Sequence, residues 1–351
     1  MRSVAVDANP ATRPVLTGTE LYAREVTRRL PGLAPELEWR LYASRPEAGL
    51  GADLTVLPFP RLWSQLRLAA ELLANRPSLL FVPAHVVPFL CPAPAIAVVH
   101  DLAYERFPEA YRPGQLAYLR LTTRWAAVRC RRLIAVSEAT RDDLQLFYGV
   151  RPERIAVVHS GGGEVASDGA RDADLLKGLG IDRPFALHVG RVERRKNQAT
   201  ALQAVERLHD DLLLVCAGEV IDPELGARLR SSPSCRALGR VSPALRDALY
   251  RQARLLLFPS LYEGFGFPVL EAMRSGLPVV TSPAGGVREI AGDAALYAEP
   301  DDVEGLASAA RKLLDDGALR RRLVAAGKRR AAAFSWDRCA EGVLEVIRSQ
   351  L

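Results

Sequence analysis

Two glutamates flank a glycine-punctuated loop in the second half of the chain. An apolar run, Leu255 to Phe258, leads into this loop, and a helical pattern follows it; Glu263 lies in the loop and Glu271 in the helix. A carboxylate can accept hydrogen bonds from two neighbouring hydroxyls, the groups that sugars and riboses present. The pair therefore predicts a site for a hydroxyl-rich ligand, with a pair of surface glutamates as the alternative.

The helix after this loop is predicted to offer a site for an anion. Pro268 suits the first helical position, so the amides of Val269 and Leu270 are expected to be unpaired and to point at a ligand. Free amides at a helix N-terminus attract phosphate. We expect Gly266, Phe267, Val269 and Leu270 to contribute to binding a phosphate-bearing ligand.

Basic residues follow an earlier apolar run near 184–190. Arg191 can grip a phosphate with its planar fork, and Lys196, one of four lysines in the chain, adds a compact charge. Together they could neutralise the charge of a diphosphate. The alternative is a solvated basic turn, which is the place we predict for Arg194 and Arg195.

Two further candidates lie in the first half of the chain. His100 follows a buried strand that ends near Val99 and could hydrogen-bond a sugar, with a structural histidine as the alternative. Asp101 is expected to cap a turn. Gly18 opens the first long helix, whose amides could face an acceptor or a diphosphate, or could simply start the helix.

The segment PSLYEGFGFPVLEAMRSGLPVVTS, with seven residues between Glu263 and Glu271, resembles the signature of family 4 retaining glycosyltransferases. The resemblance implies that Glu263 contacts the transferred sugar and Glu271 the ribose of the nucleotide. Arg191 and Lys196 match the diphosphate-binding pair of that family by position. His100 falls in an HD pair common in the family, and FPEAY and RLIAVSEATRDDL extend the similarity.

The same resemblance implies the GT-B fold, an α/β architecture of two Rossmann-like domains that face each other across a cleft. In that family, retention of anomeric configuration is commonly explained by attack on the face from which the diphosphate leaves. The resemblance along HDLAYERFPEAY and VGRVERRKN favours bacterial mannosyltransferases. This resemblance therefore predicts transfer of mannose from GDP-mannose to a saccharide or lipid-linked saccharide.

Apolar runs of strand length alternate with helical periodicity along the whole chain, which predicts parallel sheets covered by helices. Predicted strands lie near 3–7, 79–82, 95–99, 132–136, 184–190, 212–217, 254–258 and 278–281; predicted helices lie near 113–128, 138–148, 196–207, 242–252, 268–275 and 301–315.

A glycine-rich polar stretch near 160–169 predicts a linker between two domains. We expect an acceptor-binding Rossmann-like domain over 1–165 and a nucleotide-sugar-binding Rossmann-like domain over 170–334. A helix over 335–351 could pack back on the first domain. Residues 282–286 follow a strand and fit either a tight turn, which we favour, or a second ligand loop.

Composition indicates a soluble globular protein. The 351 residues are 49% hydrophobic and 25% charged, and the net charge of +6 is scattered, which favours an anionic small substrate or a lipid surface over nucleic acid. Five cysteines without a CxxC pair, and no leader-like N-terminus, indicate the cytoplasm. Residues 61–68 are basic and amphipathic, so they could contact the inner face of the membrane. Packing of their apolar side chains on a sheet is the alternative explanation of this pattern.

No metal and no cofactor are expected, and the nucleotide sugar is a substrate. Asp172 and Asp174 have the spacing of a metal-binding acid pair, but we expect them to begin a helix. The nucleotide base is expected near Gly239, Arg240 and Val241.

Two alternative functions share this architecture or site: a nucleotide-sugar epimerase, and a non-catalytic subunit that binds a nucleotide sugar. A nicotinamide-dependent oxidoreductase is excluded, because no GxGxxG follows the opening strand.

Overall fold

The computed structural model describes the chain except for residues 1, 60, 163–168, 170–171 and 209–211. The chain folds into two compact units, which are described one at a time. Unit 1 comprises Met1–Gly161 and Phe334–Leu351, and unit 2 comprises Gly162–Ala333. The predicted linker near 160–169 contains the point where unit 1 gives way to unit 2, although most of it lies outside the described residues.

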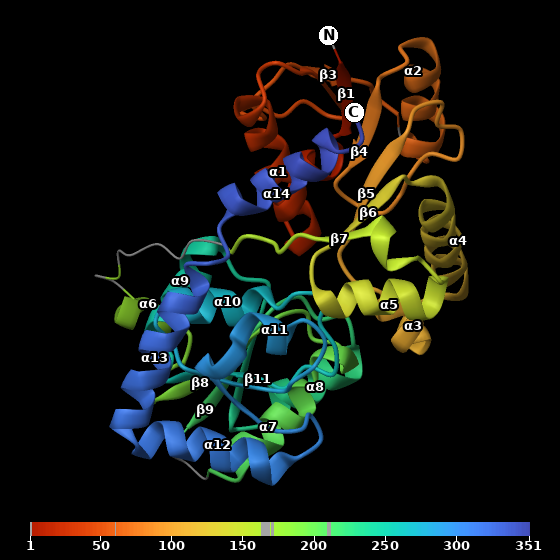
Figure 1. Cartoon of the computed structure of the whole chain (residues 1–351). Coiled ribbons are helices and arrows are strands. Elements are labelled where there is room, and N and C mark those ends of the chain that lie inside the picture. Colours follow the sequence, from red (N-terminus) through yellow and green to blue (C-terminus); the bar gives the residue numbers. More distant parts are fainter. Residues whose placement is uncertain (1, 60, 163–168, 170–171, 209–211) are drawn as a thin grey trace. The chain divides into compact units, whose positions relative to one another are not determined.

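Unit 1 is built on a parallel seven-stranded sheet in the order β3-β2-β1-β4-β5-β6-β7 (Figure 1). Its strands are β1 (Ser3–Asp7), β2 (Glu38–Ala43), β3 (Leu54–Val56), β4 (Leu79–Val82), β5 (Ala95–Val99), β6 (Arg132–Ala135) and β7 (Ile155–Val157). Every residue of β1, β4 and β5 is buried, as expected of parallel strands covered on both faces.

Helices cover both faces of this sheet. The longer ones are α1 (Gly18–Leu33), α2 (Ala69–Ala74), α4 (Pro113–Arg129), α5 (Glu138–Tyr148) and α14 (Trp336–Arg348). The π-helical turn η2 (Ser64–Leu68) leads into α2, and together with α4 and α5 these elements share one apolar core with the strands.

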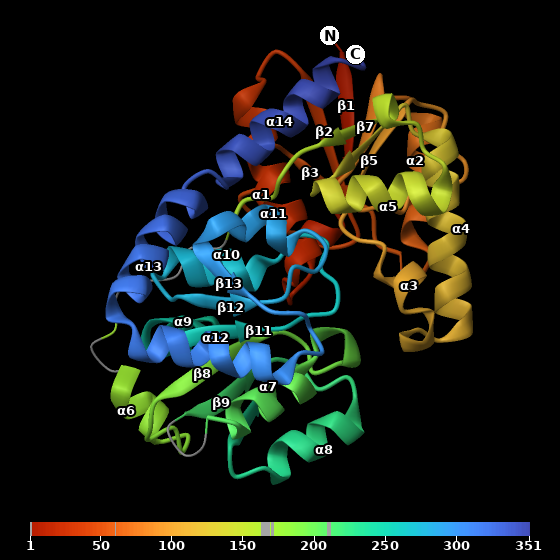
Figure 2. The same cartoon turned by 60° about the horizontal axis from the view of Figure 1, so that its bottom comes forward.

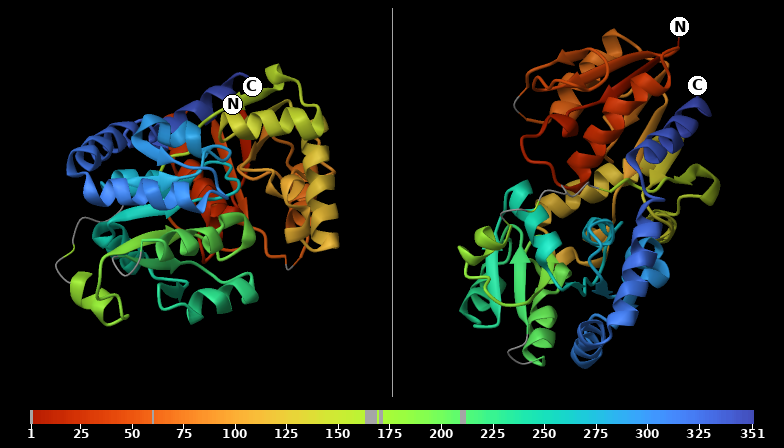
Figure 3. Two further views of the ribbon diagram at one scale, coloured as in Figure 1. Left: turned by 90° about the horizontal axis from the view of Figure 1, so that it is seen from below. Right: turned by 90° about the vertical axis from the view of Figure 1, so that its left-hand side faces the viewer.

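The last helix of the chain belongs to unit 1. α14 packs against α1, as Figures 1 and 2 show, and Figure 3 shows the blue C-terminal helix beside the red N-terminal elements from two further sides. Its buried face includes Trp336, Val343, Leu344 and Ile347, the positions at which the sequence shows helical spacing.

Unit 2 is built on a parallel six-stranded sheet in the order β10-β9-β8-β11-β12-β13. Its strands are β8 (Phe185–Val189), β9 (Leu213–Ala217), β10 (Cys235–Gly239), β11 (Leu255–Phe258), β12 (Val279–Thr281) and β13 (Ala295–Tyr297). Its helices include α6 (Asp172–Lys177), α7 (Gln198–Glu206), α8 (Pro223–Ser231), α9 (Pro243–Gln252), α10 (Phe267–Arg274), α11 (Val287–Ala291), α12 (Val303–Asp315) and α13 (Gly317–Ala331).

The helices of unit 2 form two groups. α7 and α12 pack together on strand β11, side by side in Figure 2, whereas α10 packs on β11 and β12 and carries α11 and α13. This arrangement places the loops after β8 and β11 at one edge of the sheet, because the two strands are adjacent and parallel.

All eight predicted strands and six predicted helices are present to within a few residues, and the segment 79–99 is strand, loop and strand as predicted. The sequence analysis missed β2, β3, β7, β10 and β13. All five cysteines are buried free thiols. Among the described residues, no helix has both the length and the apolar character needed to cross a membrane.

Candidate active site

The loops that follow β8 and β11 are held together by the residue at the end of a short 3₁₀ turn, η5 (Arg194–Lys196). Asn197 has a positive φ of 58°, a conformation that asparagine tolerates better than most residues. Its side-chain amide donates to the carbonyl oxygens of Pro259 (3.0 Å) and Pro300 (2.6 Å). The turn that carries Lys196 is thereby fixed against the loop that carries Glu263.

Lys196 and Glu263 meet at this edge. The Lys196 Nζ donates to Glu263 Oε1 at 2.6 Å, and the Ser260 hydroxyl lies 2.6 Å from the same oxygen. The Lys196 ammonium also lies 5.5 Å from the centre of the Phe258 ring. All these side chains are buried, so the sequence-predicted Lys196 and Glu263 form one desolvated ion pair.

Burial acts to raise the pKa of Glu263, but the charges of Lys196 and Arg195, with hydrogen bonds from Lys196 and Ser260, outweigh it and hold that pKa below its usual value. Burial lowers the pKa of Lys196, and the Glu263 charge offsets part of this effect. Glu263 is therefore a carboxylate at neutral pH, facing an ammonium that keeps two further N–H donors.

The prediction that Arg195 lies in solvent is wrong, because its side chain is buried. Its side chain is only 10% exposed; it donates to the carbonyl of Tyr262 (2.8 Å), pairs with Glu193 (2.9 Å) and lies 3.5 Å from Glu263. The tight η5 turn packs its middle residue under the loop of Glu263, whereas Arg194 is exposed as predicted.

Arg191 stands at the outer end of this charged network. Its side chain is 53% exposed and its guanidinium lies 3.8 Å from Glu193, which also pairs with Arg195. The charges alternate along the series Arg191, Glu193, Arg195, Glu263, Lys196. Arg191 is thus available to an anionic ligand, whereas Lys196 is paired with Glu263.

Glu271 lies in a separate buried contact group. Its Oε2 accepts a hydrogen bond from Tyr250 (2.7 Å), and its Oε1 lies 3.7 Å from Arg246; both partners are on α9. Burial raises the pKa of Glu271, and the Arg246 charge and the Tyr250 hydrogen bond offset part of that rise. The sequence analysis missed both partners, because nothing in the spacing places α9 beside α10.

The prediction of free amides at the start of α10 is wrong. The helix begins at Phe267, so Pro268 is its second residue, and the amides of Val269 (3.0 Å) and Leu270 (3.2 Å) both donate to the carbonyl of Gly266. Gly266, with φ 107°, caps the helix and lets the chain turn so tightly that these donors are used internally. Val269 and Leu270 are therefore not free anion donors.

The loop over residues 282–286 supports the Glu263 backbone. Gly286 N donates to the carbonyl of Glu263 (2.9 Å), and the Ser282 hydroxyl donates to the carbonyl of Ser260. Gly285 has φ 57°, and a Cβ there would lie 2.2 Å from the Glu263 carbonyl oxygen. This loop is a tight turn, the alternative that the sequence favours, and it also supports the loop that carries Glu263.

His100 and Gly18 belong to unit 1. His100 follows β5, and its Nε2 lies 2.8 Å from the carbonyl of Pro83, while its ring meets Tyr22 edge-on at 4.9 Å. A carbonyl only accepts, so Nε2 carries a proton. Burial lowers the pKa of His100, opposed by that hydrogen bond, so the ring is neutral and its Nδ1 is an acceptor.

The turn at Asp101 and the start of α1 agree with the sequence analysis. Asp101 accepts from the amide of Ala103 at 3.1 Å. α1 begins at Gly18, and Thr17 and Glu20 form a capping box over its first turn.

Asp172, of the candidate metal-binding pair, and Arg240, of the candidate base site, both form ion pairs. Asp172 begins α6 and pairs with Arg251 (2.7 and 2.8 Å), whereas the side chain of Asp174 lies outside the described residues. Within the described part of the chain, no three His, Cys, Asp or Glu side chains are grouped as metal ligands. Arg240 pairs with Glu219 at 2.7 Å, and both are half exposed.

Some apolar side chains of residues 61–68 pack in the core of unit 1, and others are exposed to solvent. Trp63 and Leu68 are buried in the core of unit 1, whereas Leu62 and Leu66 are 59% and 52% exposed. Packing therefore accounts for Trp63 and Leu68, but not for the exposed Leu62 and Leu66.

Two family models match the chain, one over each half. Residues 176–330 match the model described as glycosyl transferases group 1, and residues 17–161 match the model described as glycosyltransferase family 4. Together the matches cover most of the chain, and the first contains Arg191, Lys196, Glu263 and Glu271.

Curated relatives carry glycosyltransferase names. The chain is 28% identical over 257 residues to the O-antigen chain mannosyltransferase B of Escherichia coli, covering 70% of this chain and 68% of the relative. It is 29% identical over 340 residues to the alpha-maltose-1-phosphate synthase of Mycobacterium tuberculosis, covering 88% and 87%.

Solved structures share the fold along the whole chain. Anabaena HepE in complex with UDP-glucose has a TM-score of 0.78 at 18% identity, covering 99% of this chain and 100% of that one. Sucrose-phosphate synthase from Thermosynechococcus elongatus has a TM-score of 0.80 at 20% identity, covering 99% of each chain. With its two parallel-sheet α/β units and a match to a glycosyltransferase model in each, the chain belongs to the family 4-like glycosyltransferases and has the GT-B fold.

Proposed function

We propose that this glycosyltransferase moves a hexose from a nucleotide-sugar donor to a saccharide or lipid-linked saccharide, with retention of anomeric configuration. The observation that carries the proposal is the buried Lys196–Glu263 pair at the sheet edge of unit 2, beside an exposed Arg191. A carboxylate fixed by a lysine and a serine suits sugar hydroxyls, and the neighbouring cations suit a diphosphate.

Within this proposal each residue has a role. Arg191 and the two remaining donors of Lys196 neutralise the departing diphosphate, Glu263 contacts the transferred sugar, and Glu271 uses its Oε1 on the ribose. His100 offers its Nδ1 to a sugar hydroxyl, Gly18 contributes through the start of α1, and Gly266 and Phe267 line the donor site. The proposed mechanism uses no covalent nucleophile from the protein.

In the proposed reaction, the acceptor oxygen bonds to the anomeric carbon on the face from which the diphosphate leaves. The bond between that carbon and the diphosphate oxygen breaks, and the acceptor proton passes to the departing phosphate oxygen. Because protein cations handle the leaving-group charge, the reaction is proposed to need no metal and no cofactor.

GDP-mannose is the proposed donor. Two relatives support mannose as the sugar by name, the O-antigen chain mannosyltransferase B of Escherichia coli and an MMP alpha-(1->4)-mannosyltransferase of Mycolicibacterium hassiacum. Other relatives are named alpha-maltose-1-phosphate synthase and glycogen synthase. The proposed location is the cytoplasm, with peripheral contact at the inner membrane face when the acceptor is lipid-linked.

A thermal-shift titration against GDP, UDP, dTDP and ADP tests the donor. A nucleotide at a hundredfold excess over its dissociation constant adds about 2.7 kcal/mol to stability, and Glu271→Ala should abolish that shift. A shift with none of the four would contradict the nucleotide-sugar proposal. A shift with UDP or ADP alone would overturn only the choice of GDP.

Product analysis tests the reaction. With the matching nucleotide sugar, we expect turnover only when an acceptor is present, and a product whose anomeric configuration by NMR equals that of the donor. Conversion of the free nucleotide sugar without an acceptor would indicate an epimerase instead.

A further inference from the structure

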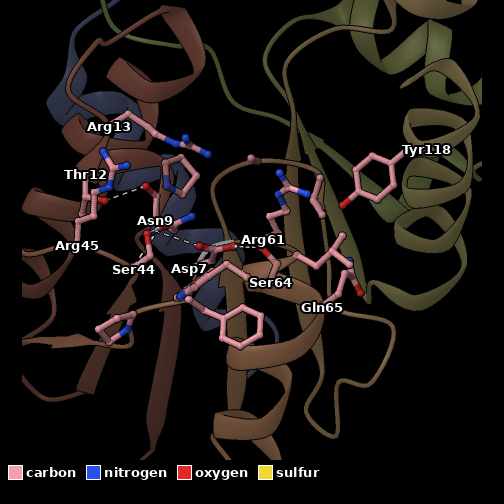
Figure 4. A pocket seen from close by; sticks show the side chains of 17 residues that line it. Asp7, Asn9, Thr12, Arg13, Ser44, Arg45, Arg61, Ser64, Gln65 and Tyr118 are labelled. Carbon is pink, nitrogen blue, oxygen red and sulfur yellow. Dashed lines mark hydrogen bonds between the residues drawn. The ribbon is translucent and has the colours of Figure 1, made fainter. Parts of the chain in front are cut away.

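A pocket of about 870 Å³ lies wholly within unit 1, at the carboxyl end of β1. It is lined by five separate stretches of that unit: the turn after β1, the turn after β2, the segment into η2, the loop after β4, and one residue of α4. Its size is within the range of small-molecule sites. Figure 4 shows Asp7 and Ser64 joined by a hydrogen bond within this lining, with Arg13, Arg45, Arg61 and Tyr118 around them.

Asp7 gives the pocket a buried carboxyl group. It is 3% exposed; its Oδ1 accepts from the amide of Asn9 (3.1 Å) and its Oδ2 from the hydroxyl of Ser64 (3.4 Å). Burial raises the pKa of Asp7 to about 7, against these hydrogen bonds and the charge of Arg13. The carboxyl oxygens retain lone pairs that a ligand hydroxyl could satisfy, and such pairing offsets the cost of burying the group.

Three arginines add positive charge to the same lining. Arg13, Arg45 and Arg61 are exposed, and none lies within 4 Å of an acidic side chain among the described residues, although the charge of Arg13 acts on Asp7. Glu47, two residues after Arg45, pairs with Arg24 instead (2.8 Å). Guanidinium forks without an acid partner match phosphate and carboxylate groups in shape and charge.

We propose that this pocket binds the acceptor, and that the acceptor is a hydroxyl-rich molecule that carries an anionic group such as a phosphate. Asp7 and its polar neighbours receive the hydroxyls, and Arg13, Arg45 and Arg61 receive the anion. The inference rests on the proposed transferase function and adds the chemical class of its second substrate. Phe59 and Leu62, 39% and 59% exposed, line the same pocket and would contact an apolar chain attached to the phosphate.

Calorimetric titration of the full chain tests the pocket with three probes: glucose 1-phosphate, glucose, and monomeric dihexanoylphosphatidylglycerol. The first is a soluble hydroxyl-rich anion, the second lacks the anion, and the third carries the phosphate and hydroxyls on a lipid. We expect at least one anionic probe to bind at least tenfold more tightly than glucose. The probe that binds distinguishes a free sugar phosphate from a lipid-borne one.

Variants then place the binding. Arg45→Gln with Arg61→Gln should weaken the anionic probe at least tenfold, and Asp7→Asn should weaken it with the arginines intact. Arg76→Gln, an exposed arginine of unit 1 outside the pocket, is the matched control and should change nothing. Equal affinity for glucose and both anions, no binding of any probe, or anion binding that survives the double substitution would overturn the proposal.

Nucleotide affinity is measured in the same samples. It should be unchanged by the pocket variants, because the proposed donor residues Lys196, Glu263 and Glu271 lie in unit 2. Failure of the wild-type chain to bind any nucleotide would contradict the proposed function instead, so the two failures are distinguishable.

Discussion

At the scale of single residues, Lys196 has a structural role and a proposed catalytic role, and a single substitution removes both. It neutralises buried Glu263, and it is proposed to act on the leaving diphosphate. Breaking a buried ion pair by removing one partner costs about 3–5 kcal/mol of stability, because the other charge stays buried. A loss of activity in Lys196→Ala alone could therefore be a loss of folding.

Lys196→Ala combined with Glu263→Gln removes the unpaired charge, and comparison with Glu263→Gln alone separates the role of Lys196 in stability from its role in turnover. We expect the double variant to recover most of the thermal stability that Lys196→Ala loses, while turnover stays about 10²–10³-fold below wild type. Nucleotide affinity should fall far less than turnover, because the missing interaction is made mainly in the transition state. Equal losses in affinity and turnover, measured by calorimetry and steady-state kinetics, would make Lys196 a structural residue.

Asp7 gives a pH-dependent prediction. Its pKa is about 7 in the folded chain, against an ordinary value of 3.8, so between these pH values the folded chain binds a proton that the unfolded chain does not. Stability contributed by this group is therefore full below pH 4 and is lost as the pH rises to 7, by an amount on the order of 4 kcal/mol.

Asp7→Asn removes this titration. The difference in melting temperature between Asp7→Asn and wild type should move in favour of the variant as the pH rises from 5 to 8. Other groups contribute equally to both proteins and cancel. A difference that is constant with pH would show that Asp7 titrates normally.

At the scale of elements, the site depends on a turn that touches no ligand. Gly285→Ala would place a Cβ 2.2 Å from the Glu263 carbonyl oxygen. We expect the loop of Glu263 to shift and turnover to fall at least tenfold, while nucleotide affinity, proposed to depend on Glu271, changes little. The matched control is Gly149→Ala, which shares a positive φ of 62° but meets no atom within 4 Å. Equal effects of the two substitutions would attribute the loss to backbone strain alone.

The same scale shows what the sequence could predict. Strands such as β5 and β11 are continuous apolar runs and were predicted almost to the residue. β2, with the sequence EWRLYA, has three partly buried polar or aromatic residues before its three buried ones, and β3 and β7 have three residues each, so their apolar patterns are weak. The sequence places the start of α10 one residue too late. With the true start at Phe267, the amides of Val269 and Leu270 are hydrogen-bonded to Gly266 instead of free.

For the site, residues in a continuous motif were easier to predict than residues brought together by packing. Glu263 and Lys196 stand in recognisable loops, and the adjacency of β8 and β11 explains why they meet. The run of basic residues predicts a solvated turn for Arg194 and Arg195 alike, and only the geometry of the turn decides that Arg195 is the one that is buried. The Asp7 pocket joins residues more than 100 positions apart, which no local spacing reveals.

At the scale of the whole molecule, the order of the chain does not match the order of its units. α13 belongs to unit 2, yet α14, which follows it, belongs to unit 1 and packs against α1. Each unit has its own apolar core, so the two can be destabilised separately.

Two matched substitutions test this separation. Leu344 on α14 and Leu323 on α13 are each 4% exposed, and replacing either with alanine should cost about 2–5 kcal/mol in its own core. Backbone hydrogen exchange should rise across β1 and α1 in Leu344→Ala, and across β8 and α10 in Leu323→Ala, although the two leucines lie only 21 positions apart. Faster exchange in both units with either substitution would mean that the whole chain unfolds as one cooperative body, and the C-terminal helix would then couple the units instead of completing the first.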